Sequence, residues 1–203
     1  MVTSTRPPFA AAPVTLVGHH VRLEPLAARH AADLLEAGRD PSIWTYLSRP
    51  AFRDLADTER WIAEVLAEVA AGRQVAFATV DLEAGRAVGS TRYLDIRPAD
   101  RGIEIGSTWL GTAAQRTAVN TECKYLLLEH AFETLGAFRV QLKTDARNTR
   151  SQNAIARIGA TREGVLRRHM AVRDGYVRDS VYFSILDSEW PSVKAALLVK
   201  LGR

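Results

Sequence analysis

The sequence predicts an α/β (α+β) fold in which helices flank a mixed, mostly antiparallel central sheet. Three consecutive segments alternate apolar and polar residues as strands do, namely Val75–Leu82, Ala87–Ile96 and Ile103–Leu110. Helical patterns with apolar residues three and four positions apart stand before them, at Asp57–Ala71, and after them, at residues 119–135. Strands grouped between helices in this order indicate a sheet with helices on its faces.

The N-terminal part of the chain is expected to hold one bent strand, or two short ones, and two helices. Val14–Leu26 has the strand pattern, and Ala28–Ala37 is expected to be helical. Met1–Pro13 contains three prolines and no periodic pattern, so we expect a mobile tail over 1–13 and a single domain over 14–203. A chain of 203 residues, 47% of them hydrophobic, suffices for one well-buried core.

The helix predicted over residues 119–135 should bury one face. That face carries Val119, Cys123, Leu126, Leu127, Ala131, Phe132 and Leu135. Because the lone cysteine falls on it, we expect an inert buried thiol and no internal disulfide, which points to a reducing cytoplasm.

The rest of the chain predicts strand, helix and hairpin in turn. Residues 139–144 alternate like a strand, Asn148 can cap a short helix, and Gly159 can end it. A strand is expected from Ala160 to Arg167, and Asp-Gly within Arg173–Tyr176 predicts a hairpin between the last two strands.

Several classes of protein are disfavoured by what the sequence lacks. No apolar run has the length of a membrane-spanning helix, and no signal peptide is evident, so no membrane partner is expected. The five histidines form no set with metal-ligand spacing, and neither a Gly-x-Ser-x-Gly elbow nor a phosphate-loop lysine is present. We therefore expect no metal and no covalent nucleophile.

The segment from Gln115 to Glu122 combines the end of a strand with the start of a helix. Such a junction presents unpaired backbone N–H groups and the positive end of the helix dipole, which suit an anion. The segment resembles the pyrophosphate-binding loop of the GNAT acyltransferases, Gln/Arg-x-x-Gly-x-Gly/Ala, although Asn120 departs from that pattern. The resemblance implies acetyl-coenzyme A as cofactor, bound by Gln115, Arg116, Thr117, Ala118, Val119, Asn120 and Thr121.

The order of short motifs after this loop resembles the RimJ/RimL-like branch of the GNAT enzymes. These motifs are Glu129–Glu133, Arg139-Val140, Asn148-x-x-Ser151, Ile158–Ala160, Glu163–Arg167, Gly175-x-x-Arg178-Asp179 and Ser188–Trp190. The resemblance implies an N-acetyltransferase in which Asn148 and Ser151 flank the pantetheine and the thiol of the cofactor. In this branch the serine of the Asn-x-x-Ser motif lies near the thiol, so the resemblance implies a catalytic role for Ser151. Ile155 departs from the family pattern, because many GNAT enzymes carry there a tyrosine that protonates the departing thiolate.

The acceptor amine must be neutral to attack a thioester. An α-amine with a pKa near 8 is partly neutral at pH 7.5, so a weak base suffices. Glu104 is the expected base, with His169 and Glu163 as alternatives. The expected acceptor pocket contains Trp44, Tyr46, Tyr93, Trp109 and His169, although aromatic residues of this kind are also common in cores.

The charge of the chain is unevenly placed. Residues 139–178 contain ten Lys or Arg against three acidic residues, while the whole chain carries +4. This basic stretch fits coenzyme A phosphates, an acidic acceptor or an ordinary solvated surface.

We expect an acetyl-coenzyme A-dependent N-acetyltransferase, a monomer or homodimer, acting on an amine-bearing small molecule or a protein N-terminus. The alternatives are a GNAT-fold coenzyme A-binding or partner-binding module and a nucleic-acid-associated protein; direct nucleic-acid binding is not expected.

Overall fold

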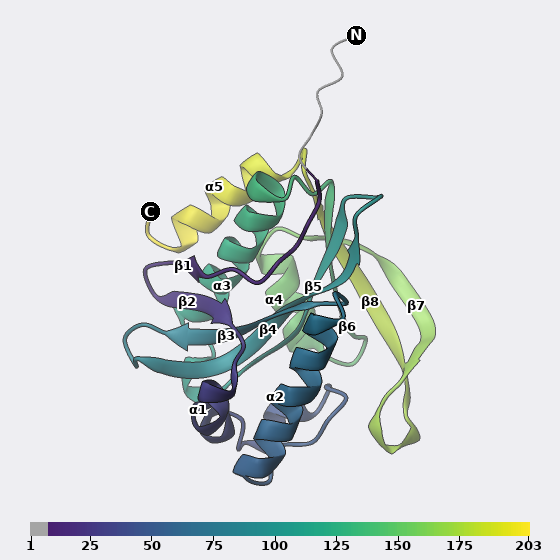
Figure 1. The fold of residues 1–203 in the computed structure, drawn as a ribbon. Coiled ribbons are helices and arrows are strands. Elements are labelled where there is room, and N and C mark those ends of the chain that lie inside the picture. The colour runs from purple at the N-terminus through teal and green to yellow at the C-terminus, as the bar shows by residue number, and fades with distance from the viewer. Residues whose placement is uncertain (1–7) are drawn as a thin grey trace.

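The computed structural model describes residues 8–203, apart from the side chain of Asp174. Eight strands form one sheet in the order β1-β2-β3-β4-β5-β6-β8-β7 (Figure 1). All neighbouring strands are antiparallel except β5 and β6, which are parallel. The strands are β1 (Leu16–Val17), β2 (Val21–Pro25), β3 (Val75–Asp81), β4 (Arg86–Arg97), β5 (Gly102–Leu110), β6 (Arg139–Asp145), β7 (Thr161–Ala171) and β8 (Val177–Leu186).

Helices cover both faces of this sheet and create two hydrophobic clusters. One cluster lies between the sheet and α3, α4 and α5; the other lies under α1, α2 and the segment around Trp44. The helices are α1 (Ala31–Ala37), α2 (Leu55–Ala70), α3 (Ala118–Glu129), α4 (Thr149–Arg157) and α5 (Trp190–Lys200). The predicted fold class is confirmed.

The predicted strands and helices are confirmed to within a few residues, including the hairpin between β7 and β8. Of the two alternatives for Val14–Leu26, the structure has two short strands, β1 and β2. The final helix, α5, was not among the predicted elements. Part of the predicted tail, residues 1–7, lies outside the described residues; within 8–13, Phe9 is buried in the core beneath α3 and α5.

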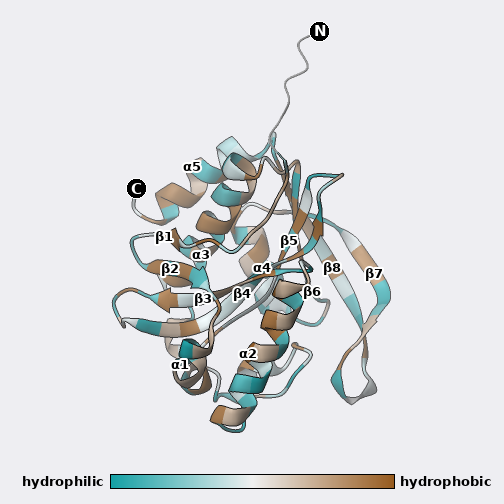
Figure 2. Ribbon diagram, in the orientation of Figure 1, coloured by the Kyte–Doolittle hydropathy of each residue, from teal (hydrophilic) through white to brown (hydrophobic). Residues whose placement is uncertain are grey.

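The helix predicted over 119–135 consists of α3 followed by a π-helical turn, His130–Thr134. All seven residues of its predicted apolar face are buried. Figure 2 shows apolar and polar residues mixed along α3, and burial extends to two of its charged residues, Glu122 and Lys124. The reason is that α3 packs against α5 and against β1 and β2 at one end of the sheet, as well as against the middle of the sheet.

Candidate active site

The parallel strands β5 and β6 separate after three residue pairs. Gly102 to Glu104 pair with Arg139 to Gln141, and beyond them β5 runs to Leu110 and β6 to Asp145 without pairing to each other. Helices α3 and α4 begin shortly after the ends of these two strands. Ligands of open α/β sheets bind in crevices outside the carboxyl ends of such strands.

Gln115 connects the two segments that border this gap. Its Oε1 accepts a hydrogen bond from Arg150 Nη1 at 3.0 Å, and its Nε2 donates to the Leu110 carbonyl at 2.9 Å. The sequence-predicted cofactor loop and the Asn148–Ser151 segment therefore lie next to each other, although 35 positions separate Gln115 from Arg150.

The start of α3 has the geometry of a capped helix. Thr117 Oγ1 accepts a hydrogen bond from the Val119 amide at 3.2 Å and donates one to the Ala114 carbonyl at 2.8 Å. Arg116, directly before the cap, is exposed and has a φ of 62°, a left-handed conformation that turns the chain into the helix. The amides of Ala118 and Asn120 have no acceptor within an ideal helix and are suited to an anion.

Asn148 caps α4 as predicted, because its Oδ1 accepts a hydrogen bond from the Ser151 amide at 3.0 Å. Ser151 is half-buried in the first turn of this helix. Ile155, one turn further on, is buried in the hydrophobic cluster shared with α3. An aliphatic side chain in the core has no proton to give to a thiolate.

Glu104 is 1% exposed and lies at the point where β5 and β6 separate. Its neighbours Ile103 and Ile105 point into the cluster beneath α3, so the Glu104 side chain projects from the opposite face of the sheet. Its Oε2 accepts hydrogen bonds from Lys143 Nζ at 2.9 Å and from Gln141 Nε2 at 3.1 Å. The surroundings of the carboxylate are therefore polar.

His169 lies on the same face as Glu104, half-buried and fixed at both ring nitrogens. Nδ1 is 2.9 Å from Ser180 Oγ, and Nε2 is 3.2 Å from the Tyr182 hydroxyl. Burial, with the nearby Lys143 and Arg178 cations, lowers the pKa of His169 below its ordinary value, so the ring is neutral at pH 7. A neutral imidazole can accept a proton.

Glu163, the other predicted alternative for the base, is engaged elsewhere. Both of its carboxylate oxygens accept hydrogen bonds from Arg139, and Ser184 Oγ donates to it at 2.8 Å. The hydrogen bonds from Arg139 lower the pKa of Glu163 despite some burial. A carboxylate held in this way on the sheet surface is a weak proton acceptor, so Glu163 does not fit the role of base.

The predicted pocket aromatics fall in three places. Trp44 and Trp109 are buried together, with ring centroids 4.9 Å apart. Tyr46 is half-buried, with the Arg147 guanidinium 5.7 Å from its ring centroid. Tyr93 belongs to the opposite face of the sheet, where its hydroxyl donates to the Leu127 carbonyl at 2.5 Å, so its inclusion in the acceptor pocket was wrong.

Trp44 and Trp109 line a pocket of about 340 Å³ between α2, the segment from Trp44 to Arg49 and the strands β4 and β5. It lies on the face of the sheet that carries Glu104. Its lining also contains Trp61, Arg49 and Arg92, which the sequence analysis missed. Trp61 stands in the predicted apolar stripe of α2, but no local pattern marks the two arginines.

Three of the ten basic residues in the stretch 139–178 form ion pairs with described side chains. Arg139 pairs with Glu163, Lys143 with Glu104, and Arg147 with Asp145. Within residues 8–203, no three His, Cys, Asp or Glu side chains gather as metal ligands. No helix of the described chain is long and apolar enough to cross a membrane.

Comparison with known proteins agrees with this geometry. Residues 20–161 match the family model of the acetyltransferase (GNAT) domain, and the chain therefore belongs to the GNAT acetyltransferases. A GCN5-related N-acetyltransferase from Brucella melitensis is 31% identical, with a TM-score of 0.90 over 98% of this chain and 90% of that one. The protein is accordingly an N-acetyltransferase, and enzymes of this family use acetyl-coenzyme A.

Two other solved structures are similar. A putative acetyltransferase from T. thermophilus is 40% identical, with a TM-score of 0.85 over 94% of this chain and 98% of that chain. RimJ from Mycobacterium smegmatis, solved in complex with CoA-disulfide, is 24% identical with a TM-score of 0.79 and 98% coverage of both chains, a likeness of fold. Among curated proteins, no sequence matches this chain.

Proposed function

We propose that this enzyme is of the RimJ/RimL-like kind and transfers the acetyl group of acetyl-coenzyme A to an α-amine, either on a peptide N-terminus or on a small metabolite. The observation that carries the proposal is the separation of β5 and β6 at Glu104, with the starts of α3 and α4 beyond it. The motifs of the RimJ/RimL-like branch in residues 129–190 support it further.

In the proposed complex, the cofactor pyrophosphate lies against the amides of the α3 start, from Arg116 to Thr121. The pantetheine enters the gap between β5 and β6, flanked by Asn148 and Ser151. Helix α3 covers one face of the sheet and Glu104 projects from the other. The amine therefore approaches the thioester from the Glu104 side.

The proposed reaction is direct attack. Glu104 takes a proton from the ammonium form, through water, and the amine nitrogen then attacks the thioester carbonyl. The nitrogen loses its second proton to water as the carbon–sulfur bond breaks and the thiolate leaves, and a proton from solvent, relayed by the Ser151 hydroxyl, restores the thiol. Because an α-amine already loses its proton near pH 8, a carboxylate tied to Lys143 is sufficient for this substrate.

Peptides that differ only in which amine is blocked test this proposal. With acetyl-coenzyme A saturating, thiol release should persist when the Lys side chain is blocked and disappear when the N-terminus is blocked. Acetylation that survives a blocked N-terminus and vanishes with a blocked Lys would overturn the α-amine assignment.

A further inference from the structure

The pocket beside Glu104 contains two buried hydrogen-bond donors without partners among the described residues. They are Nε1 of Trp109, a residue 5% exposed, and Nε of Arg92. Nη1 of the same Arg92 guanidinium donates to Gln74 Oε1 at 3.1 Å. Both groups are donors only, and buried donors in native proteins nearly always have an acceptor. A ligand that fills this pocket therefore has to bring oxygen atoms.

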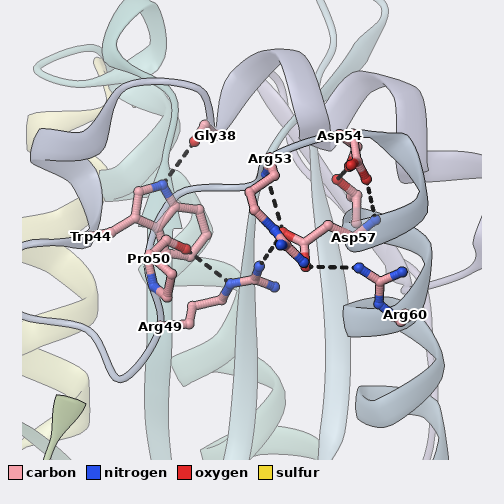
Figure 3. Close-up of polar contacts among 9 residues, drawn as sticks. Gly38, Trp44, Arg49, Pro50, Arg53, Asp54, Asp57 and Arg60 are labelled. Carbon is pink, nitrogen blue, oxygen red and sulfur yellow. Dashed lines mark hydrogen bonds and ion pairs between the residues drawn. The ribbon is translucent and has the colours of Figure 1, made fainter. Parts of the chain in front are cut away.

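Around Asp57 positive charge dominates, although the pocket lining itself holds three arginines, Arg49, Arg60 and Arg92, against Asp57, Glu64 and Glu68. Arg49, Arg53 and Arg60 all converge on the single carboxylate of Asp57, at 3.0, 3.8 and 3.4 Å (Figure 3). Hydrogen bonding from the Arg53 amide and these nearby arginines outweigh burial and lower the pKa of Asp57, which therefore stays ionised.

The two glutamates of the lining do not reverse this balance. Arg73 engages both oxygens of Glu68. Glu64 acts on Arg49 from a distance. Burial lowers the pKa of Arg92 to about 10, against the attraction of Glu68, so Arg92 is still cationic at neutral pH.

Aromatic rings form the walls of the pocket. Trp61 faces the Arg92 guanidinium, whose central carbon is 5.5 Å from the ring centroid, and Arg49 lies 5.5 Å from the Trp44 ring. Flat apolar walls exclude water, and a hydrogen bond between ions is stronger where water is excluded.

The strand register sets the distance between this pocket and Glu104. Leu94 pairs with Glu104, and Arg92 pairs with Gly106, so Arg92 and Glu104 are diagonal neighbours on one face. Side chains in that relation start about 7–8 Å apart. A Cβ at Gly106 would lie 2.8 Å from Glu104 Oε1 and 3.0 Å from Leu94 Cδ1, so only glycine lets the Glu104 carboxylate pack this closely beside it.

From these observations we infer that the pocket binds a carboxylate of the acceptor, held by Arg92 and Trp109 and placed several bonds from the amine that faces Glu104. This inference rests on the proposed function, because it assumes that the amine is acetylated beside Glu104. The carboxylate can belong to a small amino acid or to the first side chain of a peptide.

Matched acceptors test the inference and separate the two sources. Glutamate is compared with glutamine, and a peptide beginning with Glu with the same peptide beginning with Gln, by thiol release at saturating acetyl-coenzyme A. We expect the carboxylate member of at least one pair to have a kcat/KM higher by roughly tenfold or more, mainly through KM. Equal kcat/KM for the two members of each pair overturns the inference and leaves the acetyltransferase assignment intact.

Three variants examine the residues. Arg92→Met should bring the ratio of kcat/KM between the carboxylate and amide acceptors down towards one. Trp109→Phe keeps an aromatic ring but loses the N–H donor, and should lower this ratio in part. Arg157→Met removes an exposed arginine of α4 outside the pocket and should leave both rates and their ratio unchanged. A preference retained in both pocket variants contradicts the inference.

A binding measurement keeps the test independent of turnover and of the folding of any variant. Three of the four tryptophans line the pocket, so their fluorescence reports its occupancy. Glutarate, a dicarboxylate without an amine, should change the wild-type fluorescence saturably, and glutaramide should not. Saturable glutarate binding without acetylation of any amine would support the pocket and refute the proposed function; no response to glutarate would count against the pocket.

Discussion

At the scale of single residues, the contacts of Glu104 matter most. Its carboxylate receives hydrogen bonds from Lys143 and Gln141, so it is fixed in place and paired with a cation. A carboxylate in this setting is suited to a substrate that needs little help to lose its proton. The nearby neutral His169 is the second group on this face that can accept a proton.

Glu104→Gln keeps the size of the side chain and removes its basicity. If Glu104 is the base, kcat should fall roughly tenfold to a hundredfold, with the affinity for acetyl-coenzyme A unchanged, and the acid limb of the pH–rate profile should disappear. Glu163→Gln is the matched control, because that carboxylate is held by Arg139, and it should retain turnover. Full activity of the Glu104 variant would show that Glu104 is not the base, and would leave His169 or solvent as the proton acceptor.

Ala118 is the first residue of α3 and half-buried in the proposed cofactor loop. A large side chain there should block the approach of the pyrophosphate to the helix amides, so Ala118→Trp should raise the Kd for acetyl-coenzyme A by roughly tenfold or more. Ala99→Trp, in the exposed turn between β4 and β5, is the control. Unchanged cofactor affinity in the Ala118 variant, measured by calorimetry, would rule out this placement.

At the scale of elements, α3 is notable for burying a lysine. Lys124 is 6% exposed and forms no ion pair among residues 8–203. Its Nζ donates to Thr108 Oγ1 at 2.7 Å, and burial lowers its pKa. Because Thr108 Oγ1 also bonds to Thr91 Oγ1 at 2.8 Å, the threonine keeps a partner when the lysine is removed.

Lys124→Met should therefore stabilise the protein, by about 1 kcal/mol at pH 7. The folded-state pKa of Lys124 is lowered, so between that value and 10.5 the unfolded chain binds more protons and wild-type stability rises with pH. The advantage of the variant should shrink over the same range. Urea unfolding at pH 7 and 9.5 measures both effects, with exposed Lys200→Met as control; a destabilised variant would contradict the account.

At the scale of the whole molecule, Glu122 joins three distant parts of the chain. Its carboxylate accepts hydrogen bonds from the amides of His19, His20 and Val21 at 2.9, 2.6 and 2.8 Å, and from Arg203 near the C-terminus. Burial by itself raises the pKa of Glu122, but these hydrogen bonds outweigh it and hold the pKa below its ordinary value.

Glu122→Gln should lower the free energy of unfolding by about 1–3 kcal/mol, because one carboxamide oxygen cannot serve all these donors. The pKa is lowered on folding, so this stability is complete above pH 4.5 and is lost as the pH falls through the folded-state value. As the pH is lowered, the free energy of unfolding should thus fall less steeply in the variant than in the wild type. Glu36→Gln, in the exposed pair with Arg39, is the control; equal loss in both variants would show that Glu122 has no special role.

Local patterns in the sequence were enough to predict most of this fold. Alternation located β3 to β6, three-and-four spacing located α2 and α3, and Asn148 marked the start of α4, because these signals depend only on residues near in the chain. These local signals could not show how completely α3 would be buried. The elements that cover it, β1, β2 and α5, are far from α3 in the sequence.

The sequence by itself therefore determined the fold class, the family and most of the elements of this protein, but not α5. Only the tertiary structure decided the partners of Glu104, the face on which Tyr93 lies and the pocket formed by Arg92, Trp61 and Trp109. The physical reason is that helices cover both faces of the sheet, and both faces are therefore apolar. The alternation of side chains along a strand then does not tell which residues lie on which face. Strand register and the separation of β5 from β6 then bring residues together that no local pattern connects.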